Sequence, residues 1–174
     1  MALVKNDLLT AMIDGVKDYP DGGANAMKAL GKAIEDYLVN NTDCTYSWVG
    51  ANSSGTADTT VSFNAELEAS GEDFSCTPED FDGFISDLAT FIGKIKINAP
   101  SGFTLTSLKS GKGTFTASQI GELEDEKDVD KAMKSAYGEI AQGILDGWKS
   151  YFMASATGTH SEVYTGTATL TTVA

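Results

Sequence analysis

The sequence predicts an α+β fold in which an antiparallel β-sheet packs against about four helices, within one domain of residues 1–174. Three observations support this prediction. Apolar residues recur at helical spacing in four segments. Residues 61–69 alternate between apolar and polar side chains, as expected for a strand with one buried face. The predicted strands follow one another in pairs with few helices between them, which favours antiparallel hairpins over a parallel sheet.

Two helices are predicted within residues 1–40. Asn6 or Asp7 can cap the first helix, and the sequence Pro20–Gly23 ends it. The second helix is expected from about residue 24 to residue 38, because its apolar residues are spaced three and four apart: Met27, Leu30, Ile34 and Tyr37. Since the connection is only a few residues long, we expect an antiparallel helical hairpin.

Residues 43–118 are predicted to hold strands around a central helix. Residues 45–49 and 61–69 are expected to pair in antiparallel fashion across a long polar loop. Thr77 can cap the central helix, whose apolar residues follow at helical spacing: Phe81, Phe84, Ile85, Leu88, Ile92 and Ile95. Residues 103–108 and 114–117 are expected to form two further short strands around a turn.

The region 122–154 holds the longest periodic segment, Asp128–Ala154, which predicts an amphipathic helix. In its second half, Ala141, Leu145, Trp148 and Phe152 widen the apolar sector to roughly half of the circumference, against the ~100° usual for a surface helix. That half is therefore expected to pack on two surfaces. The second surface is either the domain's own sheet or another subunit.

The C-terminal region, residues 159–174, is predicted to form a strand over residues 163–173. Its five threonines give a high β-propensity but bring little apolar area to bury. Such a strand needs a sheet edge for its backbone hydrogen bonds, either in its own domain or in a neighbouring subunit. We expect an edge strand that helps to link copies, and the candidate protein-contact residues are Leu145, Trp148, Phe152, Tyr164 and Leu170.

Composition limits the partners that the chain can have. The formal net charge is −13, and a surface that acidic repels both nucleic-acid phosphates and anionic membranes. Neither nucleic acid nor a membrane is therefore expected as a partner. No apolar run approaches the ~18 residues that a membrane span requires, and Met1–Pro20 lacks the pattern of a secretory signal. The protein is expected to be made in a cytoplasm.

No set of residues predicts catalysis, a metal site or a cofactor. Glu66 and Glu68 could act as acid and base or hold a cation, but solvated strand faces commonly carry such pairs. His160 is the only histidine, and no cysteine lies near it in the sequence. Cys44 and Cys76 lack metal-ligand spacing and are predicted to stay reduced. An enzyme that uses Glu66, Glu68 or His160 is the least favoured hypothesis.

Two segments at the ends of the chain carry a family resemblance. The opening Met1–Leu9 leads directly into an amphipathic helix, and Ile140–Ile144 with Trp148 precede the segment Tyr164–Thr169. In both features the chain resembles small virion structural proteins of tailed bacteriophages. In that group, an Ala/Ile-rich helix ending in Trp precedes a Thr-Gly-Thr-Ala tail. The resemblance covers the two ends of the chain and not its middle.

This resemblance implies a structural, non-enzymatic component of a head, neck or tail. Such a protein would be located in the virion, act as one of many copies in a symmetric homo-oligomer, and contact other virion proteins. The alternative hypothesis is a cytoplasmic protein-binding module or assembly adaptor that is not retained in a particle.

Overall fold

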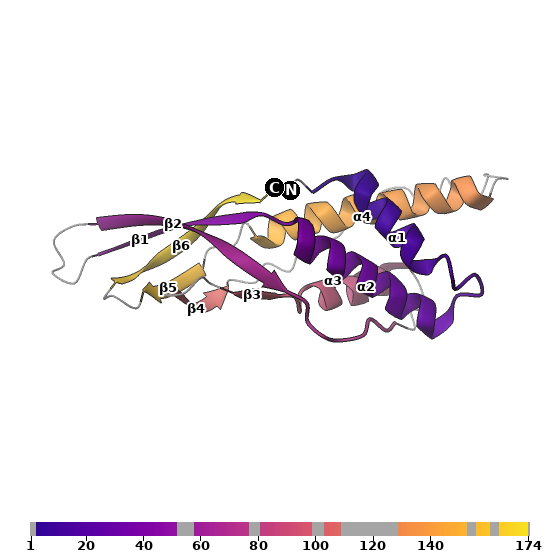
Figure 1. Ribbon diagram of the computed structural model, residues 1–174, viewed down its shortest axis with the longest axis horizontal. Coiled ribbons are helices and arrows are strands. Elements are labelled where there is room, and N and C mark those ends of the chain that lie inside the picture. Colours follow the sequence, from indigo (N-terminus) through magenta and orange to yellow (C-terminus); the bar gives the residue numbers. More distant parts are fainter. Residues whose placement is uncertain are drawn as a thin grey trace.

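The computed structural model describes residues 3–51, 58–76, 81–98, 103–108, 129–152, 156–160 and 164–173. Figure 1 shows an elongated molecule with the helices gathered towards one end and the long strands extending towards the other. The described elements are α1 (Lys5–Val16), α2 (Gly23–Asn41), β1 (Cys44–Ala51), β2 (Asp58–Glu68), α3 (Phe81–Ile92), β3 (Lys96–Asn98), β4 (Phe103–Leu108), α4 (Val129–Phe152), β5 (Ala156–His160) and β6 (Tyr164–Val173).

Helices α1 and α2 contact each other as the predicted hairpin. The two backbones come close at Gly15, where an added Cβ would stand 2.8 Å from the Cβ of Ala33. Helix α1 begins at Lys5, so Asn6 and Asp7 lie in its first turn rather than at the predicted cap. There the carboxylate of Asp7 lies near the positive end of the helix dipole.

The N-terminal segment is fixed to α2 by a tyrosine. The hydroxyl of Tyr37 accepts a hydrogen bond from the Val4 N–H at 2.7 Å and donates one to the Val4 carbonyl at 3.0 Å. Leu3, the residue before, belongs to the buried core. Leu3 and Val4 are therefore part of the folded helical body.

The buried core is built from all four helices. Helix α4 contributes five buried residues to it, and α3 contributes four: Ile140, Ala141, Ile144, Leu145 and Trp148, with Ile85, Leu88, Phe91 and Ile92. Trp148 is 1% exposed, and its Nε1 donates a hydrogen bond to the Thr42 Oγ1 at 2.9 Å. The Thr42 hydroxyl in turn donates to the Leu38 carbonyl at 2.6 Å, which ties α4 to the end of α2.

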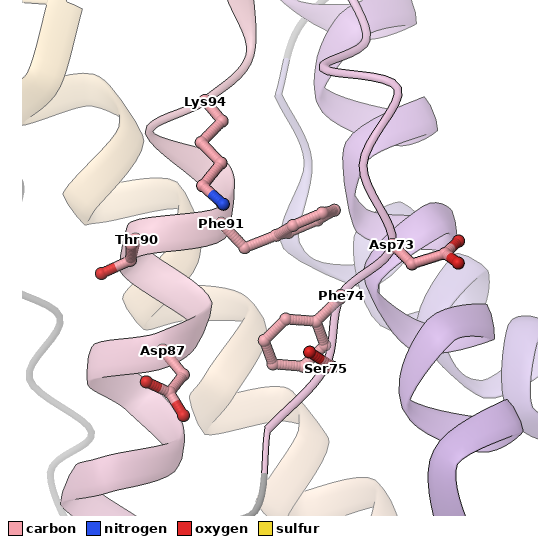
Figure 2. A pocket seen from close by; sticks show the side chains of 7 residues that line it. All are labelled: Asp73, Phe74, Ser75, Asp87, Thr90, Phe91 and Lys94. Atoms are coloured by element: carbon pink, nitrogen blue, oxygen red, sulfur yellow. The ribbon is translucent and has the colours of Figure 1, made fainter.

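Residues 69–76, which we call the crossing segment, run between α2 and α3 (Figure 2). Phe74 fills this space: it is 2% exposed, and its ring lies 5.3 Å from that of Phe91 between centroids. Gly31 of α2 makes room for it, because an added Cβ there would stand 2.1 Å from the Phe74 Cβ. The buried Glu35 accepts a hydrogen bond from the Ser70 N–H at 2.6 Å. The crossing segment therefore joins α2 to α3.

The six strands form one antiparallel sheet in the order β3-β2-β1-β6-β5-β4. The predicted pairing of β1 with β2 is confirmed, with Cys44 opposite Ala65 and Ala51 opposite Asp58. Strand β6 pairs with β1 on one side and with β5 on the other. The C-terminal strand is thus interior to the sheet, and the prediction that it is an edge strand is wrong.

The sheet must be curled. Its two edge strands, β3 and β4, are consecutive in the chain, and the connection from Asn98 to Phe103 is short. Those five steps span at most about 18 Å, whereas the edges of a flat six-stranded sheet would lie roughly 24 Å apart. The two edges must therefore approach each other.

The predicted fold class, an α+β fold with an antiparallel sheet packed against about four helices, is therefore wrong. Helices hold 67% of the residues whose side chains the structure describes, and the buried core comes mainly from them. The principal helix–helix contacts join α1 to α2 and to α4, while sheet and helices meet where α2 contacts β2 and α4 contacts β6. Alternation in a strand shows that one face is apolar, but not which element covers it.

Two short strands, β3 and β5, were not predicted, because each has only three to five residues and no clear alternation. Strand β5 takes the place beside β4 that residues 114–117 were expected to fill. Residues 114–117 and the helix cap predicted at Thr77 lie outside the described residues.

Replacing Leu88 by Ala is expected to lower the free energy of unfolding by about 2–5 kcal/mol, because a fully buried leucine leaves a cavity. Leu88 is 0% exposed on the face of α3 that was predicted to be core. Urea unfolding of the variant measures the loss. Ser86→Ala, on the exposed side of the same helix, should change the unfolding midpoint very little. Equal midpoints for Leu88→Ala and the wild type would show that this face is not packed.

Replacing Gly31 by Ala is expected to destabilise the protein by about 1–3 kcal/mol, because the added Cβ overlaps that of Phe74. The matched control is Gly138→Ala in α4, whose Cβ would meet the Lys5 Cε at 3.7 Å, an ordinary contact. That control should gain about 0.5–1 kcal/mol from helix propensity. Thermal and urea unfolding compare the two variants, and a stabilised Gly31→Ala protein would contradict the close approach of the crossing segment.

Candidate functional site

Two adjoining hollows lie beside the crossing segment, where it passes α3, and Figure 2 shows the residues that line the first of them. The first has a volume of about 150 Å³ and the second about 250 Å³. Both are bordered by Ser75 and Asp87, so the two hollows adjoin at these residues. The first is lined in addition by Asp73, Phe74, Thr90, Phe91 and Lys94, and the second by Ala24, Met27 and Cys76. We call this the Asp87 groove.

The lysines around the groove have acidic partners. Lys94 forms an ion pair with Glu72, and the Lys28 Nζ lies 2.8 Å from the Asp73 carboxylate. Asp87 has an exposed carboxylate and no ion-pair partner among the described residues. The groove therefore carries an excess of negative charge centred on Asp87.

The thiol of Cys76 lies in the less polar half of the groove. Its Sγ–H points towards the Met27 Sδ at 3.8 Å. Burial, and after it the negative charge of Asp87, raises the pKa of the Cys76 thiol above its ordinary value. Cys76 is a free thiol, as predicted, while the side chain of Cys44 lies outside the described part. A thiol with a raised pKa is a poor nucleophile at neutral pH, so Cys76 contributes apolar surface here rather than reactivity.

The structure shows the side chains of only two of the five predicted protein-contact residues. Leu145 and Trp148 are 3% and 1% exposed, so they belong to the chain's own core and offer no surface to a partner. Phe152 is the last residue of α4, and Tyr164 and Leu170 lie in β6, but their side chains are outside the part that the structure describes. The wide apolar sector of α4 is thus explained at Leu145 and Trp148 by contacts within the chain.

Of the two carboxylates considered for catalysis, Glu68 makes ordinary contacts to the neighbouring strand. The Glu68 Oε1 lies 3.1 Å from the Lys96 Nζ of β3, and the Glu68 Oε2 accepts a hydrogen bond from the Asn98 Nδ2 at 3.1 Å. The hydrogen bonds from Lys96 and Asn98 lower the pKa of Glu68. Glu66 is exposed, directly opposite Asn98 in the register. His160 ends β5, and its side chain is outside the described residues.

Within the described ranges, no group of three or more His, Cys, Asp or Glu side chains is placed to hold a metal ion. None of the helices in those ranges is long and apolar enough to cross a membrane. Comparison of the chain with protein-family models, curated proteins and solved structures finds no match.

Each hollow by itself is smaller than the pockets of roughly 300–1,000 Å³ that hold a cofactor or a drug-sized ligand. Each hollow is nevertheless several times the ~30 Å³ that one water molecule occupies in the liquid. The volume suits one or two side chains of another protein. Nothing in the sequence pattern predicts this groove, because Asp87 lies on the polar side of a helix and residues 69–76 have no periodicity.

Proposed function

We propose that this protein is a structural, non-enzymatic component of a bacteriophage virion, which acts through protein–protein contacts in a symmetric head, neck or tail assembly. The resemblance at the two ends of the chain, Met1–Leu9 and Ile140–Thr169, suggests the class of particle. The acidic net charge of −13 fits a protein that contacts other proteins rather than packaged nucleic acid.

The observation that carries the proposal is the extension of the sheet beyond the helical body (Figure 1). Strands β1 and β2 are eight and eleven residues long, and they extend away from the helices (Figure 1). A sheet that reaches outside the main core adds surface without adding to that core. An exposed sheet edge can pair with a strand of a neighbouring chain.

Two measurements test the proposal, one on purified virions and one on the isolated chain. Virions of the phage that encodes this sequence are purified, washed at high salt and treated with nuclease, and their proteins are quantified by mass spectrometry. Native mass spectrometry of the isolated chain then measures its oligomeric state. We expect the chain to be present in virions in a fixed number of copies, and the isolated chain to form a symmetric homo-oligomer.

The alternative role, an assembly adaptor, gives a different result in the same experiment. An adaptor would be found in infected-cell lysate and in immature particles, but it would be missing from washed virions. That outcome, or a chain that is found only away from particles, would overturn the proposed function.

A further inference from the structure

We propose that the Asp87 groove is a docking site for a basic side chain, an arginine or a lysine, presented by a partner protein. This inference rests on the proposed function only for the identity of the partner, which would be another protein of the assembly. The groove itself belongs to the isolated chain. It can therefore be tested without particles.

The two halves of the groove match the two parts of a basic side chain. Ala24, Met27 and Cys76 line one half, and they offer methyl, thioether and thiol surface to an aliphatic stem. Ser75 and Asp87 lie where the halves join, and they offer a hydroxyl and a carboxylate to a cationic head. Lysine and arginine bury an apolar stem while their charged head keeps polar contacts, so this order of surfaces suits them.

Charge selects a cation over other side chains. The ammonium groups of Lys28 and Lys94 are already paired with Asp73 and Glu72, whereas Asp87 has no such partner in the described ranges. An acidic side chain would meet the Asp87 carboxylate and be repelled. A purely apolar side chain would remove part of the hydration of that carboxylate and offer it no hydrogen bond, which is unfavourable. A guanidinium can donate charge-assisted hydrogen bonds to the Asp87 carboxylate.

The geometry also argues for a side chain rather than a metal ion. A divalent cation needs several oxygen ligands around one point. In the groove, Asp73 points towards α2 and away from Asp87 (Figure 2), and its carboxylate is held by Lys28. The remaining oxygens at the junction come from Asp87 and Ser75, which suffices for a hydrogen-bonding cation.

The test is a titration of the full-length ¹⁵N-labelled protein, followed by ¹H–¹⁵N correlation spectra, with three blocked amino acids. The probes are N-acetyl-arginine amide, N-acetyl-lysine amide and N-acetyl-citrulline amide, the last being an uncharged analogue of arginine. We expect saturable shifts at Ser75, Asp87 and Thr90 with the two cations, with dissociation constants of roughly 1–20 mM. Citrulline should give much weaker shifts, and added salt should weaken the binding of both cations.

Asp87→Asn removes the carboxylate and should weaken cation binding about threefold to tenfold. Asp18→Asn is the matched control, because it removes the same charge from an exposed position in the connection between α1 and α2. That control should bind as the wild type does. Circular dichroism of both variants establishes that they remain folded, which is expected because both carboxylates are exposed.

Three outcomes would overturn the docking site: no saturable shifts with either cation, equal shifts with citrulline, or equal weakening by Asp18→Asn and Asp87→Asn. A difference between arginine and lysine identifies the preferred partner residue and supports the site in either case. Failure of this titration leaves membership of the virion untouched. Conversely, a chain that is missing from virions could still bind a cation in this groove.

Discussion

Deletion of residues 159–174 is expected to abolish cooperative folding of the sheet. The deletion removes β6, which pairs with β1 along its length and with β5 on its other side. Strands β1 to β3 would then be separated from β4 and what remains of β5. Backbone groups on both new edges would lose their hydrogen-bond partners. Urea unfolding followed by circular dichroism should show a broad transition, or none, in place of the wild-type transition.

A point substitution tests the same strand without shortening the chain. Thr167 of β6 lies opposite Val49 of β1 and Thr157 of β5. Thr167→Pro removes a donor from a strand that has neighbours on both sides, which central strands tolerate poorly.

One outcome of the deletion would contradict this placement of β6. A truncated chain that unfolds cooperatively at the wild-type midpoint, but fails to assemble, would restore the interpretation of the tail as a linking edge strand.

Replacing Trp148 by Ala is expected to cost roughly 3–5 kcal/mol of unfolding free energy, as is usual for a buried tryptophan. Trp148 is 1% exposed, and its indole Nε1 bridges α4 to Thr42 at the end of α2. The variant loses both the packing of the ring and the hydrogen bond that joins the two elements. Urea or thermal unfolding measures the effect, and the isolated chain is sufficient for the experiment.

Tyr19→Ala is the control for Trp148→Ala, because Tyr19 is an aromatic residue that is 41% exposed. Its removal should change the free energy of unfolding by no more than about 0.5 kcal/mol. If Trp148→Ala instead left the unfolding midpoint unchanged and disrupted only an oligomer, the tryptophan would be a contact between subunits, as the sequence pattern first suggested.

The Asp87 groove shows why a site of this kind is hard to predict. The central helix and its apolar face were predicted correctly, and Leu88 lies in the core as expected. Asp87, the residue before Leu88, was not singled out by the sequence pattern. Its importance depends on Ser75 and Met27, which come from distant parts of the sequence. Residues that share no periodicity acquire a common surface only when the chain folds.

The sequence by itself determined the local elements. Helical spacing located α1, α2, α3 and α4, and strict alternation located β2, because the spacing of apolar residues along a segment depends on that segment's own geometry. Threonine-rich composition also located β6.

The tertiary structure alone decided what each apolar face contacts. Trp148 packs within its own chain, β6 lies between β1 and β5, and the helices pack chiefly on one another rather than across the sheet. The physical reason is that burial is nearly non-directional: an apolar stripe is stabilised equally by any apolar surface that excludes water. Which surface reaches it depends on the lengths of the connections and the curl of the sheet, and these are properties of the whole chain.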